Sequence, residues 1–155
     1  MNPLFKAEVY QNRRNKLKKA VKSGIAIFLG NSEAPMNYPS NTYKYRQDSN
    51  FLYFFGLSIA DIAAVIDFDE GRDIIFGNDF DIDDIIWMGP QPTVASKGEA
   101  IGCSKTLPLA EFDKAVMAAV AAGRPVHFLP PARYYNQMKL AELTGKPNAA
   151  VRKVA

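Results

Sequence analysis

A chain of 155 residues, 48% of them hydrophobic, has the length and apolar content of one domain with its own core. Its single cysteine, Cys103, excludes an internal disulfide and fits a reducing compartment, while the net charge of +3 is modest. The N-terminus lacks the apolar run of a signal peptide, and no stretch approaches the roughly 18 apolar residues of a membrane helix. We therefore expect a non-secreted, cytoplasmic protein.

Much of the positive charge lies in the first part of the chain. Residues 7–22 are rich in Glu, Lys, Arg, Leu and Ala and stop at Ser23-Gly24, which predicts a helix. The apolar side of this helix is thin, so most of its charges should face water rather than an acidic partner or a nucleic acid. The basic residues in and just before it are Lys6, Arg13, Arg14, Lys16, Lys18, Lys19 and Lys22.

Three short apolar segments predict buried strands. Residues 25–29 form the first. Residues 62–67 and 73–76 form an antiparallel pair, because the sequence Asp-Glu-Gly-Arg between them is typical of a hairpin turn. Residues 31–40, which follow the first strand, are dense in Asn, Ser and Pro, and this composition predicts a loop.

A polar corner joined directly to an aromatic run follows this loop. We interpret residues 51–55 as an aromatic core strand that ends at Gly56. In such an extended chain Arg46 and Asp48 share one face, where a guanidinium group can bind carboxylate or backbone oxygens, and Phe51 shares a face with Tyr53. Fixing a loop is the favoured role of Arg46 and Asp48, and a surface that faces another domain is the alternative.

The second half of the chain alternates between helices and strands. The pattern predicts a short helix over 93–101 and a longer helix over 109–122, whose apolar residues recur at three- and four-residue spacing. It also predicts a strand at 126–129 and a last helix over 133–144. The whole order indicates an α/β fold, with a mixed sheet and helices packed on its faces.

Motifs that carry chemistry are weak. The alternate carboxylates of residues 79–84 suggest calcium, but an EF-hand loop needs Gly and Glu where this run has Asp84 and Pro90. Cys103 and His127 have no spacing that brings them together, so we interpret the first as a buried apolar group and the second as a hydrogen-bonded structural residue. Nucleophile-elbow, Walker and dinucleotide-binding patterns are missing from the sequence.

Several segments together resemble one family. Residues 43–56 match a Tyr-x-Tyr/Phe-Arg-Gln-Asp/Asn-Ser-x-Phe-x-Tyr-Phe/Leu-x-Gly pattern, residues 13–17 an Arg-x-x-Leu pattern, and residues 86–89 a Trp-x-Gly pattern, while residues 25–28 look like the family's first strand. The combination resembles the N-terminal domain of aminopeptidase P, the Xaa-Pro aminopeptidase branch of the creatinase, prolidase and methionine aminopeptidase superfamily. The motif residues of the central segment are Tyr45, Arg46, Gln47, Asp48, Ser49, Phe51, Tyr53 and Gly56.

This resemblance implies a ribonuclease H-like α/β fold and a non-catalytic role. Family members carry their chemistry in a following "pita-bread" domain, where two Asp, one His and two Glu hold two divalent ions, manganese or similar. Residues 1–155 would then be a single N-terminal domain without catalytic residues or metal ligands of its own, inactive alone. Its partners would be the catalytic domain of the same polypeptide, other subunits of a homo-oligomer, and a peptide substrate with proline second.

Trp87 is the candidate functional residue of this domain. A Trp beside Gly89 and Pro90 serves either as a plug over the domain's own core or as a contact surface. The resemblance favours a role in walling the substrate cleft of an assembled enzyme, where the domain would restrict access. The alternatives are a free-standing binding or scaffold module of the same fold, and the N-domain of a prolidase- or creatinase-type hydrolase.

Overall fold

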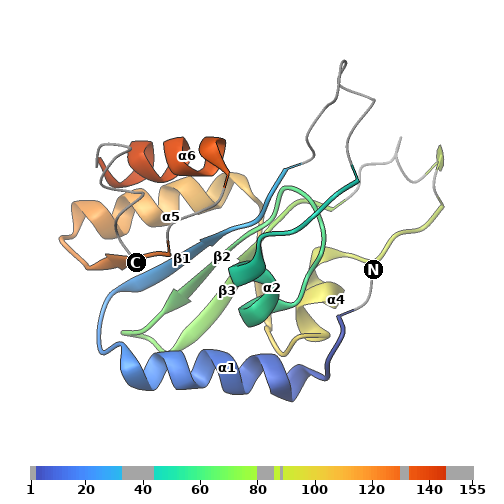
Figure 1. Cartoon of the computed structure of the whole chain (residues 1–155), viewed down its shortest axis with the longest axis horizontal. Coiled ribbons are helices and arrows are strands. Elements are labelled where there is room, and N and C mark those ends of the chain that lie inside the picture. The colour runs from blue at the N-terminus through green and yellow to red at the C-terminus, as the bar shows by residue number, and fades with distance from the viewer. Residues whose placement is uncertain (1–2, 33–43, 80–85, 88, 130–132, 146–155) are drawn as a thin grey trace.

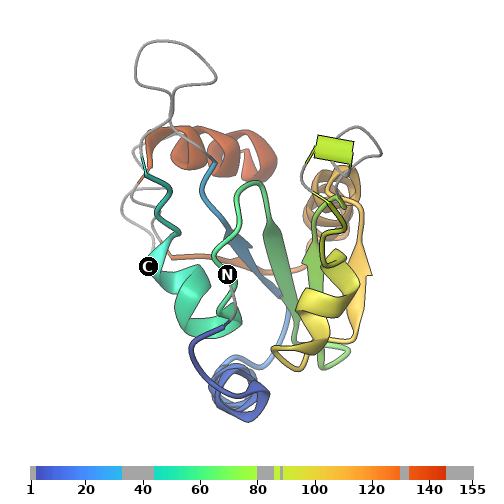
Figure 2. The same cartoon turned by 90° about the vertical axis from the view of Figure 1, so that its right-hand side faces the viewer.

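A five-stranded mixed sheet lies between two layers of helices (Figure 1, Figure 2). The computed structural model describes residues 3–32, 44–79, 86–87, 89–129 and 133–145. The strands are β1 (Ile25–Leu29), β2 (Ala63–Asp67), β3 (Arg72–Phe76), β4 (Lys105–Leu107) and β5 (Val126–His127). The helices are α1 (Ala7–Ala20), α2 (Ser49–Phe55), α4 (Val94–Glu99), α5 (Ala110–Ala121) and α6 (Tyr134–Thr144).

The strand order is β4-β3-β2-β1-β5. The hairpin predicted from the sequence is confirmed: β2 and β3 are antiparallel, and Asp67 is paired with Arg72 beside the turn. The first strand also runs antiparallel to β2. Both edge strands run parallel to their neighbours, β4 to β3 and β5 to β1. The predicted α/β fold with a mixed sheet is therefore confirmed.

Alternate residues of the strands build two separate cores. Ala26, Ala64 and Ile75 point to one face, where they pack with side chains of α1, α2 and α4. Ile27 and Val65 point to the other face and pack with α5 and α6. Because side chains alternate across a strand, strands covered by helices on both faces are apolar at nearly every position. The burial pattern of β1 and β2 shows this continuous run.

The prediction of an aromatic strand at 51–55 is wrong, because these residues form the helix α2. Asp48 caps its N-terminus and accepts hydrogen bonds from the backbone N–H groups of Asn50 and Phe51, both at 3.0 Å. Gly56 ends it in the left-handed conformation, with φ of 65°. In a helix Phe51 and Phe55, four residues apart, share the buried face, whereas Tyr53 is 51% exposed.

The remaining elements follow the predictions with shifted ends. The helices α1, α4, α5 and α6 lie within one to two residues of the predicted bounds, and β1 coincides with its predicted range. The predicted strand at 126–129 is reduced to the two residues of β5, and β4 was not predicted. Tyr43, and all of the acidic run except Asp79, lie outside the described residues.

Candidate functional site

Gln47 is the centre of a buried hydrogen-bond network at the end of the sheet. Its side-chain oxygen accepts hydrogen bonds from the backbone N–H groups of Asn31 at 2.8 Å and Asp48 at 3.0 Å. Its side-chain nitrogen donates to the carbonyl oxygens of Leu57 and Ile59, both at 3.0 Å. One amide group thereby holds together the segment after β1, the start of α2 and the segment before β2.

The hydroxyl of Tyr45 completes this network. It lies 2.8 Å from the carbonyl oxygen of Asn31, 2.9 Å from the side-chain oxygen of Gln47 and 3.0 Å from the carbonyl oxygen of Ile59. Burial, and then the proximity of Tyr135 and Asp61, raise the pKa of Tyr45 well above its usual range. The neutral hydroxyl can donate its hydrogen to one of these oxygens, which fits a structural role.

The other motif residues divide into buried supports and exposed side chains. Gln47, Phe51 and Gly56 are buried, whereas the side chains of Arg46 and Ser49 face outward. Arg46 contributes its carbonyl oxygen, which accepts from the side chain of Asn31 at 3.0 Å. The predicted role of Arg46 and Asp48 in fixing a loop stays a prediction, because the Asp48 carboxylate caps the helix α2 in the structure. The guanidinium group of Arg46 has no partner within the described part of the chain.

The segment that Gln47 holds forms one wall of a surface hollow. Asn31 also accepts a hydrogen bond from the side chain of Asn136 of α6 at 3.1 Å, with both residues buried. The hydroxyl of the next residue, Ser32, donates to the carboxylate of Asp61 at 2.6 Å, and the backbone N–H of Ser32 donates to the hydroxyl of Tyr135. The motif therefore fixes the position of Ser32 and Asp61.

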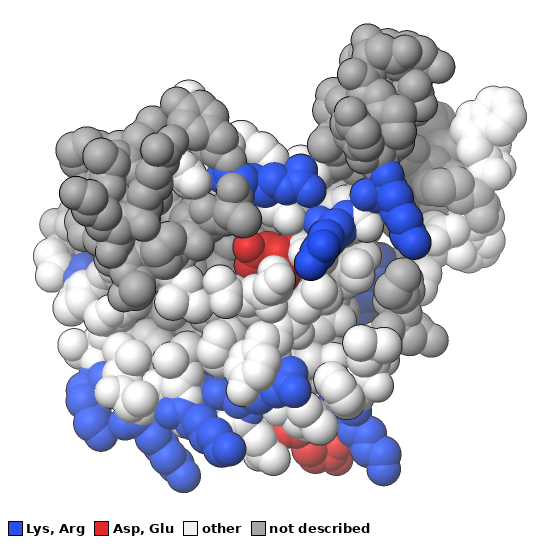
Figure 3. All heavy atoms as spheres, in the orientation of Figure 1, with Lys and Arg blue, Asp and Glu red and all other residues white. Residues whose placement is uncertain are grey.

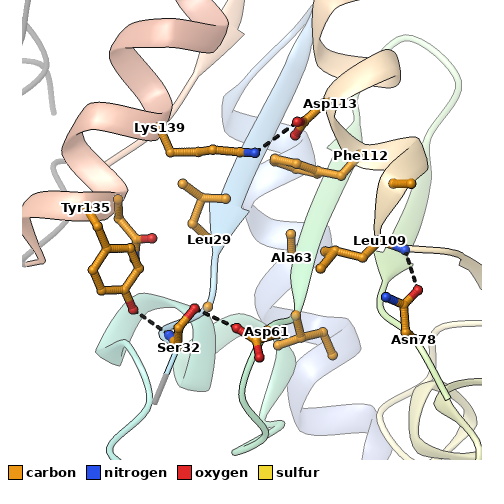
Figure 4. A pocket seen from close by; sticks show the side chains of 14 residues that line it. Leu29, Ser32, Asp61, Ala63, Asn78, Leu109, Phe112, Asp113, Tyr135 and Lys139 are labelled. Atoms are coloured by element: carbon orange, nitrogen blue, oxygen red, sulfur yellow. Dashed lines mark hydrogen bonds and ion pairs between the residues drawn. The ribbon is translucent and has the colours of Figure 1, made fainter. Parts of the chain in front are cut away.

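This hollow, of about 420 Å³, lies between α5 and α6 at the end of the sheet (Figure 4). Its centre is apolar and is formed by Leu29, Ala63 and Phe112. Ser32 and Asp61 lie on one side, and the ion pair of Lys139 with Asp113, at 2.9 Å, lies on the opposite side. We call it the α5–α6 hollow.

Asp61 has an unusual backbone conformation. Among the described residues, Asp61 is the non-glycine residue whose φ is positive, at 57°. Such conformations are rare for residues other than glycine, although Asp and Asn tolerate them better than most. Strained residues of this kind concentrate at functional sites, so the conformation of Asp61 marks the hollow as a candidate site.

Sequence reasoning missed the residues of this hollow. Ser32 was placed only in a predicted loop, and Asp61 and Lys139 carried no motif. Their residue types are common on protein surfaces, and they are far apart along the chain. The available signal was the turn-forming pair Asn31-Ser32 directly after a predicted strand, where polar residues collect at the end of a sheet.

Arg14 is the buried charge of the first helix and lies away from the hollow. It donates to the carboxylate of Asp73 at 2.7 Å and to the carbonyl oxygens of Phe54 and Ile101, both at 2.8 Å. Lys18 lies 2.9 Å from the other oxygen of Asp73, as a close ion pair without the alignment of a hydrogen bond. One guanidinium group therefore connects α1 to α2, to β3 and to the end of α4.

The basic surface of α1 is partly used by the fold itself. Figure 3 shows lysine and arginine side chains along the edge of the molecule formed by α1. The Cζ atom of Arg13 lies 4.1 Å from the centre of the Tyr53 ring, and the guanidinium group donates to the carbonyl oxygen of Tyr53 at 2.9 Å. Since Arg13, Arg14 and Lys18 all have partners within the domain, the charge available to an external polyanion is smaller than the sequence indicates.

Trp87 and its neighbour Ile86 are strongly exposed, by 87% and 71%. The interpretation of Trp87 as a plug over the domain's own core is therefore excluded, and the contact interpretation stays a prediction. Cys103 is buried, with its thiol 3.3 Å from the carbonyl oxygen of Asp73, and burial raises its pKa. His127 contacts the carbonyl oxygen of Ser23 at 3.1 Å, as its structural interpretation predicts.

The described residues contain no group of three or more His, Cys, Asp or Glu side chains that could hold a metal ion. The two acidic residues of the hollow, Asp61 and Asp113, lie on its opposite sides. These residues therefore do not fit a two-metal centre, which needs several carboxylate or imidazole ligands around each ion. None of the helices within the described ranges combines the length and apolar character that crossing a bilayer requires.

The family of the chain follows from a comparison of sequences. The family described as "Aminopeptidase P, N-terminal domain" matches residues 10–127, which is well over half of the chain. The chain belongs to this family. The match includes β1, the Gln47 network, the central hairpin and Trp87, and it ends at β5. The comparison with curated proteins found no match.

Solved structures of Escherichia coli aminopeptidase P share the fold of this aminopeptidase P N-terminal domain. A variant in complex with substrate and a zinc-substituted form in complex with product both give a TM-score of 0.71 at 20% identity, covering 90% of this chain and 32% of theirs. A form with the inhibitor Pro-Leu gives a TM-score of 0.68 at 20% identity, covering 89% and 33%. The chain thus spans about one third of the length of these proteins.

Proposed function

We propose that this chain is the N-terminal domain of a metal-dependent Xaa-Pro aminopeptidase, which removes the first residue from peptides with proline second. The observation that carries the proposal is the family match over residues 10–127, in a chain that covers 32% of Escherichia coli aminopeptidase P. The solved relatives are described with substrate, with product and zinc, and with a Pro-Leu inhibitor. A catalytic domain on the same polypeptide would bind two divalent metal ions, which in our proposal are manganese.

In this proposal the domain shapes access to the cleft and supplies oligomer contacts. The support is the exposure of Trp87 and of its neighbour Ile86, by 87% and 71%, because adjacent exposed apolar side chains of this size are typical of contact surfaces. Metal ions in the catalytic domain would act as Lewis acids and lower the pKa of a bound water. We place the protein in the cytoplasm, and expect this chain alone to be inactive.

The test compares this chain with the polypeptide in which a catalytic domain follows it. With manganese present, the longer protein should hydrolyse Xaa-Pro peptides, and the 155-residue chain should not. Hydrolysis by the chain alone, or a longer protein that cleaves only creatine or Xaa-Pro dipeptides, would overturn the proposal. The second result would assign the domain to the creatinase or prolidase branch.

The role of Trp87 is tested in the same longer protein. Trp87→Ala should change kcat/KM for peptides of different lengths by unequal factors, because a cleft wall contacts long and short substrates differently. Met117→Ala is the matched control, since Met117 is an exposed apolar side chain of α5, 59% exposed. Identical kinetics of Trp87→Ala and the wild type on all peptides would remove Trp87 from the cleft.

A further inference from the structure

We propose that the α5–α6 hollow is a binding site for a small zwitterion with an apolar body and separated charges, of which a dipeptide is the simplest example. The ammonium group of the ligand would bind at Asp61, its carboxylate at Lys139, and its apolar side chain over the centre of the hollow. The inference rests on the geometry of this domain alone and does not depend on the proposed aminopeptidase activity.

The first argument is the arrangement of charge. An acidic group, Asp61, lies on one side of the hollow, and a basic group, Lys139, lies on the other, with apolar side chains between them (Figure 4). A ligand with one charge satisfies only one side. A free amino acid carries its ammonium and carboxylate groups on one carbon, whereas a dipeptide separates them by a peptide unit and so better matches charged groups on opposite sides of the hollow.

The second argument is the remaining hydrogen-bonding capacity of both groups. Within the described structure, one carboxylate oxygen of Asp61 accepts from Ser32 at 2.6 Å, and the other has no protein donor. Lys139 carries three N–H donors, and the structure assigns one of them to Asp113. Its ion pair is half exposed and therefore weak, so a ligand carboxylate can share the ammonium group at little loss.

The third argument is the way in which the site is held. Ser32 orients the Asp61 carboxylate, and its own N–H donates to Tyr135 of α6, while Gln47 fixes the preceding residue, Asn31. The positive φ of Asp61 persists within this network, at 57°. The backbone N–H of Asp61 also donates to the carbonyl oxygen of the buried Asn31 at 3.2 Å. A strained acidic residue held at both its backbone and its side chain is the kind of preorganised group that binding sites use. The half-buried side chains of Leu29 and Leu109, which line the hollow, then offer contact to an apolar side chain.

The experiment is a titration of the ¹⁵N-labelled chain with L-alanyl-L-leucine at neutral pH, followed by two-dimensional NMR. Saturable shifts are expected at the backbone amides of Ser32, Asp61 and Ala63, with Kd about 1 mM for a ligand of this size. N-acetyl-alanyl-leucine lacks the ammonium group, and alanyl-leucine amide lacks the carboxylate. Each should bind at least about tenfold more weakly than the free dipeptide, because each leaves one charged partner without its hydrogen bond.

Two variants assign each end of the ligand. Asp61→Asn keeps the shape and tolerates the positive φ, and it should abolish the preference for the free over the acetylated dipeptide. Lys139→Met keeps an apolar stem and should abolish the preference for the free over the amidated dipeptide. Lys114→Met is the control, since Lys114 forms an ion pair on the exposed side of the same helix layer, with Glu111 at 3.4 Å, and should bind like the wild type.

Several results would overturn the inference. They are the absence of shifts at the hollow up to the solubility limit of the dipeptide, and equal binding of all three ligands to the wild-type chain. The comparison of ligands uses the wild-type chain, so it decides even where a variant fails to fold. Because no hydrolysis is measured, a negative result leaves the test of the proposed aminopeptidase function unaffected.

Discussion

The side-chain oxygen of Gln47 accepts a hydrogen bond from the backbone N–H of Asn31 at 2.8 Å and so connects the family motif to the wall of the hollow. Gln47→Ala should reduce the free energy of unfolding by about 3 kcal/mol, because buried N–H and carbonyl groups lose their partner. Urea unfolding measures this loss. The neighbouring variant Arg46→Ala is the control and should change stability by less than about 0.5 kcal/mol, since its side chain is exposed.

Equal stability of the Gln47→Ala and Arg46→Ala variants would contradict the structural role of the network. A second readout is local. The amide of Asn31 should exchange its hydrogen with solvent faster in Gln47→Ala, because it has lost its acceptor. Unchanged exchange at this amide would show that other groups hold the segment.

The helix α2 shows why the motif was misinterpreted from sequence. Its aromatic residues favour strands by intrinsic propensity, and at seven residues it is too short for a helical period to be evident. The information was in its ends, because Asp48 is a preferred N-cap and Gly56 a preferred C-cap. The packing of Phe51 and Phe55 in the core then favours the helix.

The rest of the fold could be predicted from the sequence more readily than the site. Continuous apolar runs such as 25–29 and a turn pattern such as that around Gly71 are local signals, and they predicted β1 and the hairpin. The hollow depends on contacts between Ser32, Asp61 and Tyr135, which only the folded chain brings together. Nothing in the sequence around Asp61 indicates its positive φ.

Gly56 should be more sensitive to substitution than Gly71, although both glycines have the left-handed conformation. A Cβ at this position would lie 2.3 Å from the ring of Tyr10, whereas a Cβ at Gly71 would meet nothing within 4 Å, and the two φ angles are 65° and 66°. Gly71→Ala should therefore lose only the conformational term, about 1 kcal/mol. Gly56→Ala should lose an additional amount of about 1–3 kcal/mol from overpacking, measured as a lower urea midpoint. Equal losses would mean that the ring of Tyr10 moves aside freely.

The buried hydroxyl of Tyr45 should make the protein less stable at alkaline pH. Its pKa is raised in the folded protein, chiefly by burial, so the unfolded chain loses this proton first, near pH about 10. The contribution of the Tyr45 hydroxyl to the free energy of unfolding is fully present below that pH and is lost as the pH rises above it. Tyr45→Phe should be less stable than the wild type near neutral pH by about 1 kcal/mol, because it lacks the hydrogen bond.

The alkaline comparison separates this effect from other titrating groups. Between neutral pH and pH about 11, Tyr45→Phe should lose less stability than the wild type, because it has no hydroxyl to ionise at this position. Tyr53→Phe is the control, since Tyr53 is 51% exposed, and its stability should follow the wild-type pH dependence. Parallel curves for the wild type and Tyr45→Phe would exclude Tyr45 as the group responsible.

Arg14 and Asp73 form the buried ion pair that connects α1 to the sheet, at 2.7 Å with Arg14 fully buried. Arg14→Met should reduce the free energy of unfolding by about 3–5 kcal/mol, because it leaves a carboxylate and two carbonyl oxygens without their donor. The loss should lie near the lower end of this range, because Lys18 also lies beside Asp73 and partly compensates its charge. Arg14→Lys should recover only part of it, since an ammonium group cannot reach all three acceptors in the geometry of a guanidinium group.

The exposed pair of Arg72 with Glu70, with side chains 49% and 58% exposed, provides the control for Arg14. Arg72→Met should change stability by less than about 1 kcal/mol, because exposed ion pairs contribute little. Adding Asp73→Asn to Arg14→Met should restore part of the loss, since the carboxylate that lacks its partner is then removed. The contrary result is a simple sum, in which Asp73→Asn lowers the stability of Arg14→Met as much as it lowers that of the wild type. The two side chains would then not be coupled, and the three hydrogen bonds of Arg14 would not connect the layers as their distances imply.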